Sequence, residues 1–266
     1  ARLTLLGAGR MGATLAAGWL RAGWSGRIDV IAPRPSATVQ AWAGAGEIRL
    51  NPAPAPADIL VLAVKPQVAT GLCEEMRALV GPHTRVVSVM AALTLAQLSE
   101  LLATPLVARA LPNTPGLIGH GMTPYCLPSD APAGFADEVE KLLAPLGVVE
   151  GPLREQDLRA DGLVAGCGPA YVFALTEAMA DAGVAAGLAP DRAMRLARVA
   201  VEGAGALMAA SPDISAATLR TNVTSPGGLT AAALSVLRED GDLSGLMTRA
   251  VAAGIARDLA LSEDRE

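Results

Sequence analysis

The chain has 266 residues, 52% of them hydrophobic and only 3% aromatic, so one or two domains with cores of aliphatic residues and alanine are expected. The formal net charge is −5, which argues against a nucleic-acid partner, because such proteins usually carry a basic face. No apolar run approaches the roughly 20 residues that a membrane span needs, so we expect no membrane association.

The N-terminal half alternates short apolar runs with helical stretches. Strands are expected at Leu3–Leu6, Ile28–Ile31, Ile59–Val64, Val86–Val89 and Leu106–Arg109. Helices are expected at Met11–Ala22 and Leu95–Leu102, and the proline-rich segment Leu50–Ala57 is expected to be loop. This β-α-β alternation predicts an α/β fold with a doubly wound parallel sheet of the Rossmann type.

After about residue 150, convincing strands stop and only helical patterns follow. Helices are expected at Pro169–Ala186, Pro190–Ala209, Gly227–Leu237 and Leu243–Leu261. We therefore predict a dinucleotide-binding domain over residues 1–155 and an all-helical substrate and dimerisation domain over residues 156–266. The helical domain is small and rich in Ala, Gly and Met, so pairing with a second copy would bury its faces. The alternative is a monomer whose helices pack on the sheet.

The three cysteines, Cys73, Cys126 and Cys167, are far apart and include no CxxC pair. This pattern is typical of free thiols in a reducing compartment and does not match a disulfide framework or a zinc site. The first apolar residues run straight into a glycine turn, unlike a signal peptide. We therefore expect a cytoplasmic protein without a bound metal.

Gly7-Ala8-Gly9-Arg10-Met11-Gly12 matches GxGxxG, directly after a predicted strand and at the start of a predicted helix. In this context the first glycine makes a tight turn, the second lets the backbone approach a pyrophosphate, and the third lets the helix pack on the strand. The helix N-terminus offers free N–H groups to phosphates. A glycine-rich turn without a nucleotide is the less favoured interpretation.

The end of the second strand indicates which cofactor is bound. An NAD site usually has an acid there, but Ile31-Ala32-Pro33-Arg34-Pro35-Ser36 contains none. The Arg34 guanidinium can pair with a 2′-phosphate, which favours NADPH and leaves NADH acceptance open. Asp29 is the rival, at about the right distance from the glycines but near the start of its strand.

Three further segments carry polar groups. Ala63-Val64-Lys65-Pro66 ends a strand, where ligands of doubly wound sheets bind; this position and the rarity of lysine in the chain favour a role at the cofactor for Lys65 over an exposed lysine before a turn. In the Arg109–Gly116 segment two prolines stiffen a loop that presents Asn113 and Thr114, or simply form a structural turn. The Val223–Thr230 segment leaves N–H groups free at a helix start and suits a carboxylate. An ordinary helix start, with Ser225 as the cap and Pro226 in the first turn, is a nearly equal alternative.

Together, the segments GAGRMG, AVKP, RALPNTPG, GCGPAYVF and VTSPGGLT resemble those of the pyrroline-5-carboxylate reductase family, in the same order and spacing over essentially the whole chain. The resemblance implies a Rossmann domain, a helical dimerisation domain, often rings of dimers, and reduction of pyrroline-5-carboxylate to L-proline with NADPH. It implies that the backbone of Gly228, Leu229 and Thr230, in the turn with Ser225 and Gly227, holds the substrate carboxylate. The Thr230 hydroxyl would lie near the ring nitrogen as the catalytic group.

The same resemblance implies a set of cofactor-binding residues, with Asn113 near the nicotinamide. They are Gly7, Gly9, Arg10, Met11, Gly12, Arg34, Asn51, Ala63, Val64, Lys65, Pro66 and Asn113. The chain departs from the family pattern at Cys167, where Ser is usual, at Met90–Leu93, where an Ala-Gly step is usual, and at Leu229, where Thr is frequent. These departures concern substrate preference more than reaction class.

Two other functions compete with this interpretation. A β-hydroxyacid dehydrogenase or another imine reductase would share the domain order, but the former uses a catalytic lysine on a helix after the sheet, and Lys141 is the only lysine beyond Lys65. A catalytically silent NADP-binding regulator would bind the cofactor without turnover, and the intact Ser225–Thr230 segment argues against it.

Overall fold

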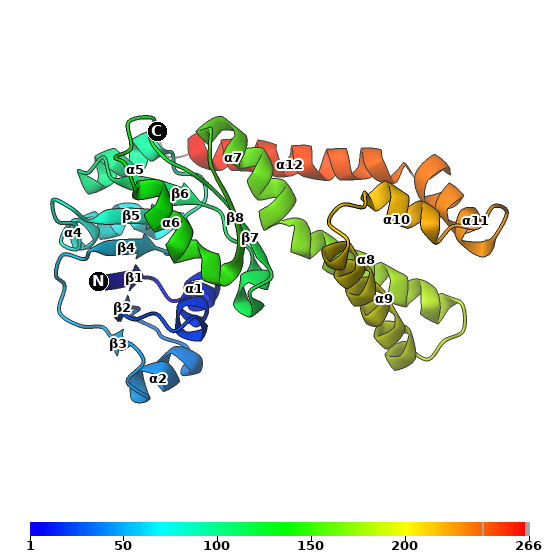
Figure 1. Cartoon of the computed structure of the whole chain (residues 1–266), viewed down its shortest axis with the longest axis horizontal. Coiled ribbons are helices and arrows are strands. Elements are labelled where there is room, and N and C mark those ends of the chain that lie inside the picture. The colour runs from blue at the N-terminus through cyan, green and yellow to red at the C-terminus, as the bar shows by residue number, and fades with distance from the viewer. Residues whose placement is uncertain (241, 264–266) are drawn as a thin grey trace. The chain divides into compact units, whose positions relative to one another are not determined.

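The computed structural model describes residues 1–240 and 242–263, and these form two compact units. The sheet unit comprises residues 1–167 together with the end of the chain from Gly254, and the helical unit comprises residues 168–253. Figure 1 shows the elements of both units along the chain. The last helix therefore starts in the helical unit and ends in the sheet unit.

The sheet unit contains one eight-stranded sheet with the strand order β3-β2-β1-β4-β5-β6-β7-β8. Its strands are β1 (Arg2–Leu6), β2 (Arg27–Ile31), β3 (Arg49–Leu50), β4 (Ile59–Leu62), β5 (Arg85–Ser88), β6 (Val107–Ala110), β7 (Gly121–Cys126) and β8 (Gly147–Leu153). All neighbouring strands are parallel except β6 and β7. The order reverses at β1 and β4, which is the arrangement expected of a doubly wound sheet, and the predicted fold class is confirmed.

Helices cover both faces of this sheet. They are α1 (Arg10–Arg21), α2 (Ala37–Gly44), α3 (Pro66–Ala69), α4 (Cys73–Arg77), α5 (Leu95–Leu102), α6 (Phe135–Leu143) and α7 (Glu155–Asp161). Side chains alternate between the faces along each strand, so Leu3 and Leu5 of β1 pack in one core and Leu6 packs in the other. The first core includes the fully buried Trp19 of α1, whose indole Nε1 donates a hydrogen bond to the Leu142 carbonyl of α6 at 2.8 Å.

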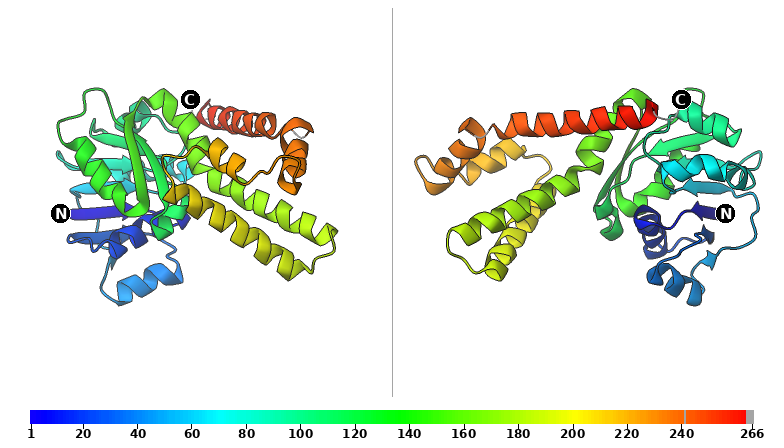
Figure 2. Two further views of the ribbon diagram at one scale, coloured as in Figure 1. Left: turned by 45° about the vertical axis from the view of Figure 1, so that its right-hand side comes forward. Right: turned by 180° about the vertical axis from the view of Figure 1, so that it is seen from behind.

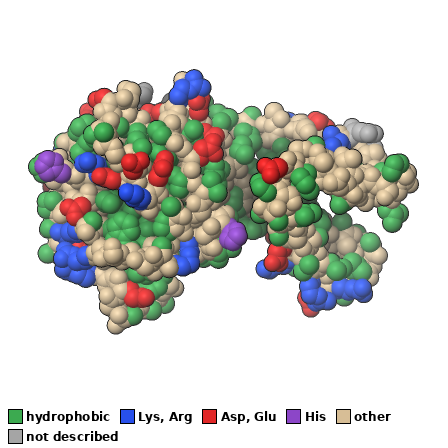
Figure 3. Space-filling model, in the orientation of Figure 1, with side chains coloured by type: hydrophobic (Ala, Val, Ile, Leu, Met, Phe, Trp, Pro, Cys, Tyr) green, Lys and Arg blue, Asp and Glu red, His purple; other side chains and the backbone are tan. Residues whose placement is uncertain are grey.

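The helical unit contains α8 (Gly168–Ala185), α9 (Pro190–Ala210), α10 (Ala216–Asn222), α11 (Leu229–Ser235) and most of α12 (Leu243–Glu263). Helices α8 and α9 run side by side in both views of Figure 2. The buried hydrophobic residues at their packed centre are Ala180, Ala193 and Ala197, with the half-buried Leu188 packed against them. Large hydrophobic side chains stay exposed, for example 61% of Phe173 and 63% of Val199, and Figure 3 shows hydrophobic side chains on the visible surface of this unit. Such exposure is typical of a surface that another protein chain covers.

Several sequence predictions need correction. The last strand, β8, ends at Leu153, close to the predicted end of the strands, but β3, β7, β8, α2, α6, α7 and α10 were not anticipated. The sequence predicts no apolar run long enough for a membrane span, and one helix comes near that limit. The helical run Glu155–Ala185 passes the test for a possible span by length and composition alone, and it is continuous only because a π-helical turn, Gly162–Gly166, links α7 to α8. A helix that packs against another subunit can pass the same test.

Candidate nucleotide-binding site

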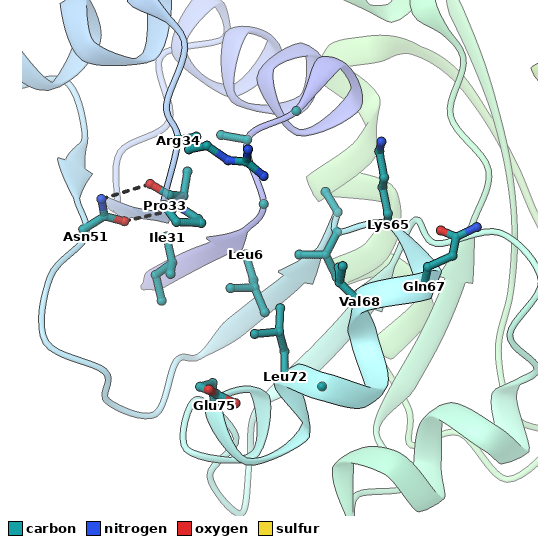
Figure 4. A pocket seen from close by; sticks show the side chains of 17 residues that line it. Leu6, Ile31, Pro33, Arg34, Asn51, Lys65, Gln67, Val68, Leu72 and Glu75 are labelled. Atoms are coloured by element: carbon teal, nitrogen blue, oxygen red, sulfur yellow. Dashed lines mark hydrogen bonds between the residues drawn. The ribbon is translucent and has the colours of Figure 1, made fainter.

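A cavity of about 1060 Å³ opens at the carboxyl ends of β1, β2 and β4 in the sheet unit. Apolar side chains from the strand ends and from the segment after β4 form much of its wall, and Figure 4 shows them with the polar groups. The lining residues are Leu6, Gly7, Ala8, Gly9, Ile31, Ala32, Pro33, Arg34, Asn51, Ala63, Val64, Lys65, Gln67, Val68, Gly71, Leu72 and Glu75. This is where an open α/β sheet binds its ligand, at the point where the strand order reverses.

The glycine loop between β1 and α1 has the geometry that a nucleotide needs. Gly7 has φ +94° and donates its N–H to the Ile31 carbonyl at 2.9 Å, and a Cβ there would lie 2.8 Å from the Ala63 carbonyl group. A Cβ on Gly12 would collide with the Gly7 carbonyl oxygen, so α1 can approach β1 only without a side chain at this position. At Gly9, by contrast, a Cβ would meet no atom within 4 Å, which leaves open space for a pyrophosphate beside the first turn of α1.

Arg10 and Met11 of the glycine motif, like Gly12, lie outside the cavity wall. Arg10 is the first residue of α1 and is exposed. Met11 is half-buried and packs against the core on the α1 side of the sheet. No side chain caps the N-terminus of α1 at Gly9, so its first N–H groups have no partner within the helix and are available to an anion.

Arg34 and Asn51 lie in the wall, as predicted, beyond the ends of β2 and β3. Asp29, the rival for the cofactor ribose, lies in the middle of β2 and is completely buried. Its Oδ2 accepts hydrogen bonds from the Nε of Arg2 at 2.8 Å and from the Nη2 of Arg27 at 3.0 Å. Asp29 is therefore paired with arginines inside the sheet and does not line the cavity, whereas Arg34 does.

Lys65 and the preceding Ala63 and Val64 also line the cavity. Figure 4 shows the Lys65 side chain extending outward beside Gln67, on the side of the cavity opposite Asn51. Pro66 begins α3, and its side chain lies outside the described part of the structure.

Asn113 does not line this cavity. Its side chain is 93% buried, its Nδ2 donates to the Ala165 carbonyl at 2.9 Å, and its Oδ1 accepts from the Met122 N–H at 3.0 Å. It therefore ties the loop after β6 to β7 and to the π-helical turn. This role was not predicted from the sequence, because Ala165 is distant from Asn113 in the chain.

The predicted substrate residues lie in the helical unit, at the start of α11. The helix begins at Leu229 with Gly228 as its N-cap and no side-chain cap, so the alternative in which Ser225 caps the helix was wrong. The Gly228 N–H donates to the Ser225 carbonyl at 3.0 Å, and Gly227 has φ +67°, which forms a tight turn before the helix. Leu229 is 93% exposed and Thr230 is exposed beside it.

The comparisons with known proteins agree with this architecture. Residues 155–261 match the family model described as pyrroline-5-carboxylate reductase dimerisation, and residues 2–92 match the model described as NADP oxidoreductase coenzyme F420-dependent. The pyrroline-5-carboxylate reductase of Pseudomonas aeruginosa is 35% identical, over 98% of this chain and 97% of the relative. The chain belongs to the pyrroline-5-carboxylate reductase family. The reductase of Pisum sativum is 33% identical over 98% of this chain and 96% of that protein.

Solved structures of pyrroline-5-carboxylate reductases share the fold over their whole length. The enzyme of Coxiella burnetii superposes with a TM-score of 0.86 at 29% identity and covers 98% of both chains. A Plasmodium falciparum pyrroline carboxylate reductase, solved with NADP bound, gives a TM-score of 0.84 at 26% identity, again over 98% of both chains. The match to a dimerisation model explains the exposed hydrophobic side chains of the helical unit.

Sequence reasoning missed the far wall of the cavity, formed by Gln67, Val68, Leu72 and Glu75. These residues belong to the short helices after β4, whose few turns produce no clear helical periodicity. The sequence predicts no bound metal. Among the described residues, no group of three or more His, Cys, Asp or Glu side chains could hold a metal ion.

Proposed function

We propose that this member of the pyrroline-5-carboxylate reductase family reduces 1-pyrroline-5-carboxylate to L-proline, with NADPH as the hydride donor. One observation carries the proposal most directly. The chain matches reductases of this name over nearly its full length, and its sheet unit has the glycine loop and the cationic wall that an NADP cofactor requires.

The cofactor, when bound, supplies the hydride, so the protein has to bind the cofactor and the substrate, orient them toward each other, and exclude water from the site. The open space at Gly9 and the first N–H groups of α1 suit the pyrophosphate. Arg34 suits a 2′-phosphate, because a guanidinium binds phosphate oxygens through two parallel hydrogen bonds. Lys65 adds a positive charge on the opposite side of the cavity.

The substrate carboxylate is assigned to the turn of Ser225, Gly227 and Gly228 and to the N–H groups of Leu229 and Thr230. The support is the family sequence pattern together with the uncapped start of α11. Thr230 is the catalytic candidate: its hydroxyl, near the ring nitrogen, would orient the imine. The proton for the nitrogen would come from water, either directly or relayed through this hydroxyl, as the hydride reaches the neighbouring carbon.

The helical unit is assigned to homodimer formation, and assembly of the dimers into a ring is part of the proposal. The small packed centre of α8 and α9 supports it, because a single copy leaves most of their large apolar side chains exposed. The three free cysteines support a cytoplasmic location.

The test is NADPH oxidation by the purified protein with three substrate and cofactor combinations. The first is NADPH with pyrroline-5-carboxylate, the second replaces NADPH by NADH, and the third replaces the substrate by 1-pyrroline, which lacks the carboxylate. Rapid oxidation that needs the carboxylate and proceeds better with NADPH is expected. Absence of turnover with NADPH still bound would refute the reaction and leave the nucleotide site standing.

A further inference from the structure

Asn51 extends the pairing of β2 and β3 with its side chain. The two strands pair only through Asp29 with Arg49 and Val30 with Leu50. The Asn51 N–H then donates to the Val30 carbonyl at 2.8 Å. Its side chain continues the ladder: Oδ1 accepts from the Ala32 N–H at 2.8 Å, and Nδ2 donates to the Ala32 carbonyl at 3.0 Å.

The backbone of Asn51 is adapted to this pairing. Its φ of +48° lies in the left-handed region, where asparagine is tolerated better than most side chains. The carboxamide thus binds both main-chain polar groups of Ala32 just beyond the last pair of the β2–β3 ladder. Figure 4 shows the two hydrogen bonds at one end of the cavity.

The segment held in this way carries Arg34. On the other side of β2, the Ile31 carbonyl accepts the N–H of Gly7 at 2.9 Å, so the chain is fixed from both sides up to Ala32, which is 97% buried. Pro33 follows, and its restricted φ limits the directions in which the chain can continue to Arg34. Among the described residues, no hydrogen bond or ion pair to the Arg34 side chain is found, so its placement depends on the backbone that carries it.

We propose that Asn51 is a positioning residue for cofactor choice: its double hydrogen bond to Ala32 holds the β2 end so that Arg34 meets the 2′-phosphate of NADPH. The inference rests on the proposed NADPH dependence and deepens it. It predicts that Asn51 contributes to NADPH binding through Arg34, and contributes little to the binding of NADH, which lacks the 2′-phosphate.

The test compares equilibrium binding of NADPH and NADH to the wild-type protein and to Asn51→Gly, without any substrate. Glycine adopts a φ of +48° without strain, so this change removes the side-chain hydrogen bonds and keeps the backbone. We expect NADPH affinity to fall about tenfold, the worth of one good charge-assisted hydrogen bond, and NADH affinity to change less than about twofold. Ala103→Gly is the matched control, because Ala103 also has a left-handed backbone, at φ +53°, but does not line the cavity. It should leave both affinities unchanged.

A double substitution separates positioning from direct contact. In the Arg34→Ala background, Asn51→Gly should cause no further loss of NADPH affinity, since the group that it positions is absent. A full tenfold loss in that background would mean that Asn51 touches the phosphate itself, and would overturn the inference. Equal weakening of NADPH and NADH in Asn51→Gly would overturn it as well. A wild-type protein without any preference for NADPH would instead refute the proposed cofactor, which is a different failure.

Discussion

Two alanines of the sheet unit have left-handed backbones, and they should respond differently to replacement by glycine. Ala92, after β5, has φ +61° and is 4% exposed; Ala103, the C-cap of α5, has φ +53° and is exposed. A left-handed conformation costs a residue with a Cβ about 1–2 kcal/mol. Glycine removes that cost but adds about 0.4–1 kcal/mol of conformational entropy to the unfolded chain.

The two substitutions differ in their net effect on stability because the methyl group of Ala92 is buried and that of Ala103 is exposed. Ala103→Gly should raise the free energy of unfolding by about 0.8 kcal/mol, the difference between those two terms at their midpoints. At Ala92 the buried methyl group adds a loss of about 0.8 kcal/mol, which cancels the gain. Ala92→Gly should therefore leave stability nearly unchanged.

Tryptophan fluorescence during denaturant unfolding measures this directly. All three tryptophans, Trp19, Trp24 and Trp42, belong to the sheet unit, so the signal reports the unit that contains both alanines. The two variants should differ by about 0.8 kcal/mol in unfolding free energy at an unchanged denaturant slope. Equal stabilisation of both variants, or destabilisation by Ala103→Gly, would refute the reasoning from backbone strain and methyl burial.

Three further predictions concern the site and the core. Gly12→Ala should lower NADPH affinity more than about tenfold in a binding titration, because the new Cβ collides with the Gly7 carbonyl oxygen and displaces the phosphate loop; wild-type affinity would contradict this. Thr230→Ala should lower kcat by about tenfold or more with NADPH binding nearly intact, and unchanged steady-state kinetics would remove Thr230 from the site. Burial raises the pKa of Cys126 to about 11, so its thiol favours the folded state below the ordinary cysteine pKa and loses that contribution as pH rises toward 11. Cys126→Ala should flatten the fall in unfolding free energy above about pH 9, as measured by denaturation across that range.

The sequence allowed good predictions where local chemistry decides the structure. The helix Leu95–Leu102 was predicted with its observed bounds from its helical spacing, and in the structure a capping box of Thr94 and Gln97 stabilises its start. Strand β8 was missed because it is an edge strand whose residues alternate between half-buried and exposed, with two glycines and a proline in seven residues. The role of Asn113 could not be predicted at all, since its side-chain amide donates a hydrogen bond to the carbonyl of Ala165, 52 residues away.

Asp29 shows why residue counting alone misleads at the cofactor site. It follows the glycine motif at about the spacing of the acid that binds a ribose in NAD enzymes. A strand rises about 3.3 Å per residue, so Asp29 lies about 7 Å before Ile31, the first residue of β2 that lines the cavity. The buried carboxylate instead neutralises Arg2 and Arg27 within the sheet. Position along the strand, rather than distance from the glycines, therefore decides which side chain can meet the ribose, and at that position the chain carries Arg34.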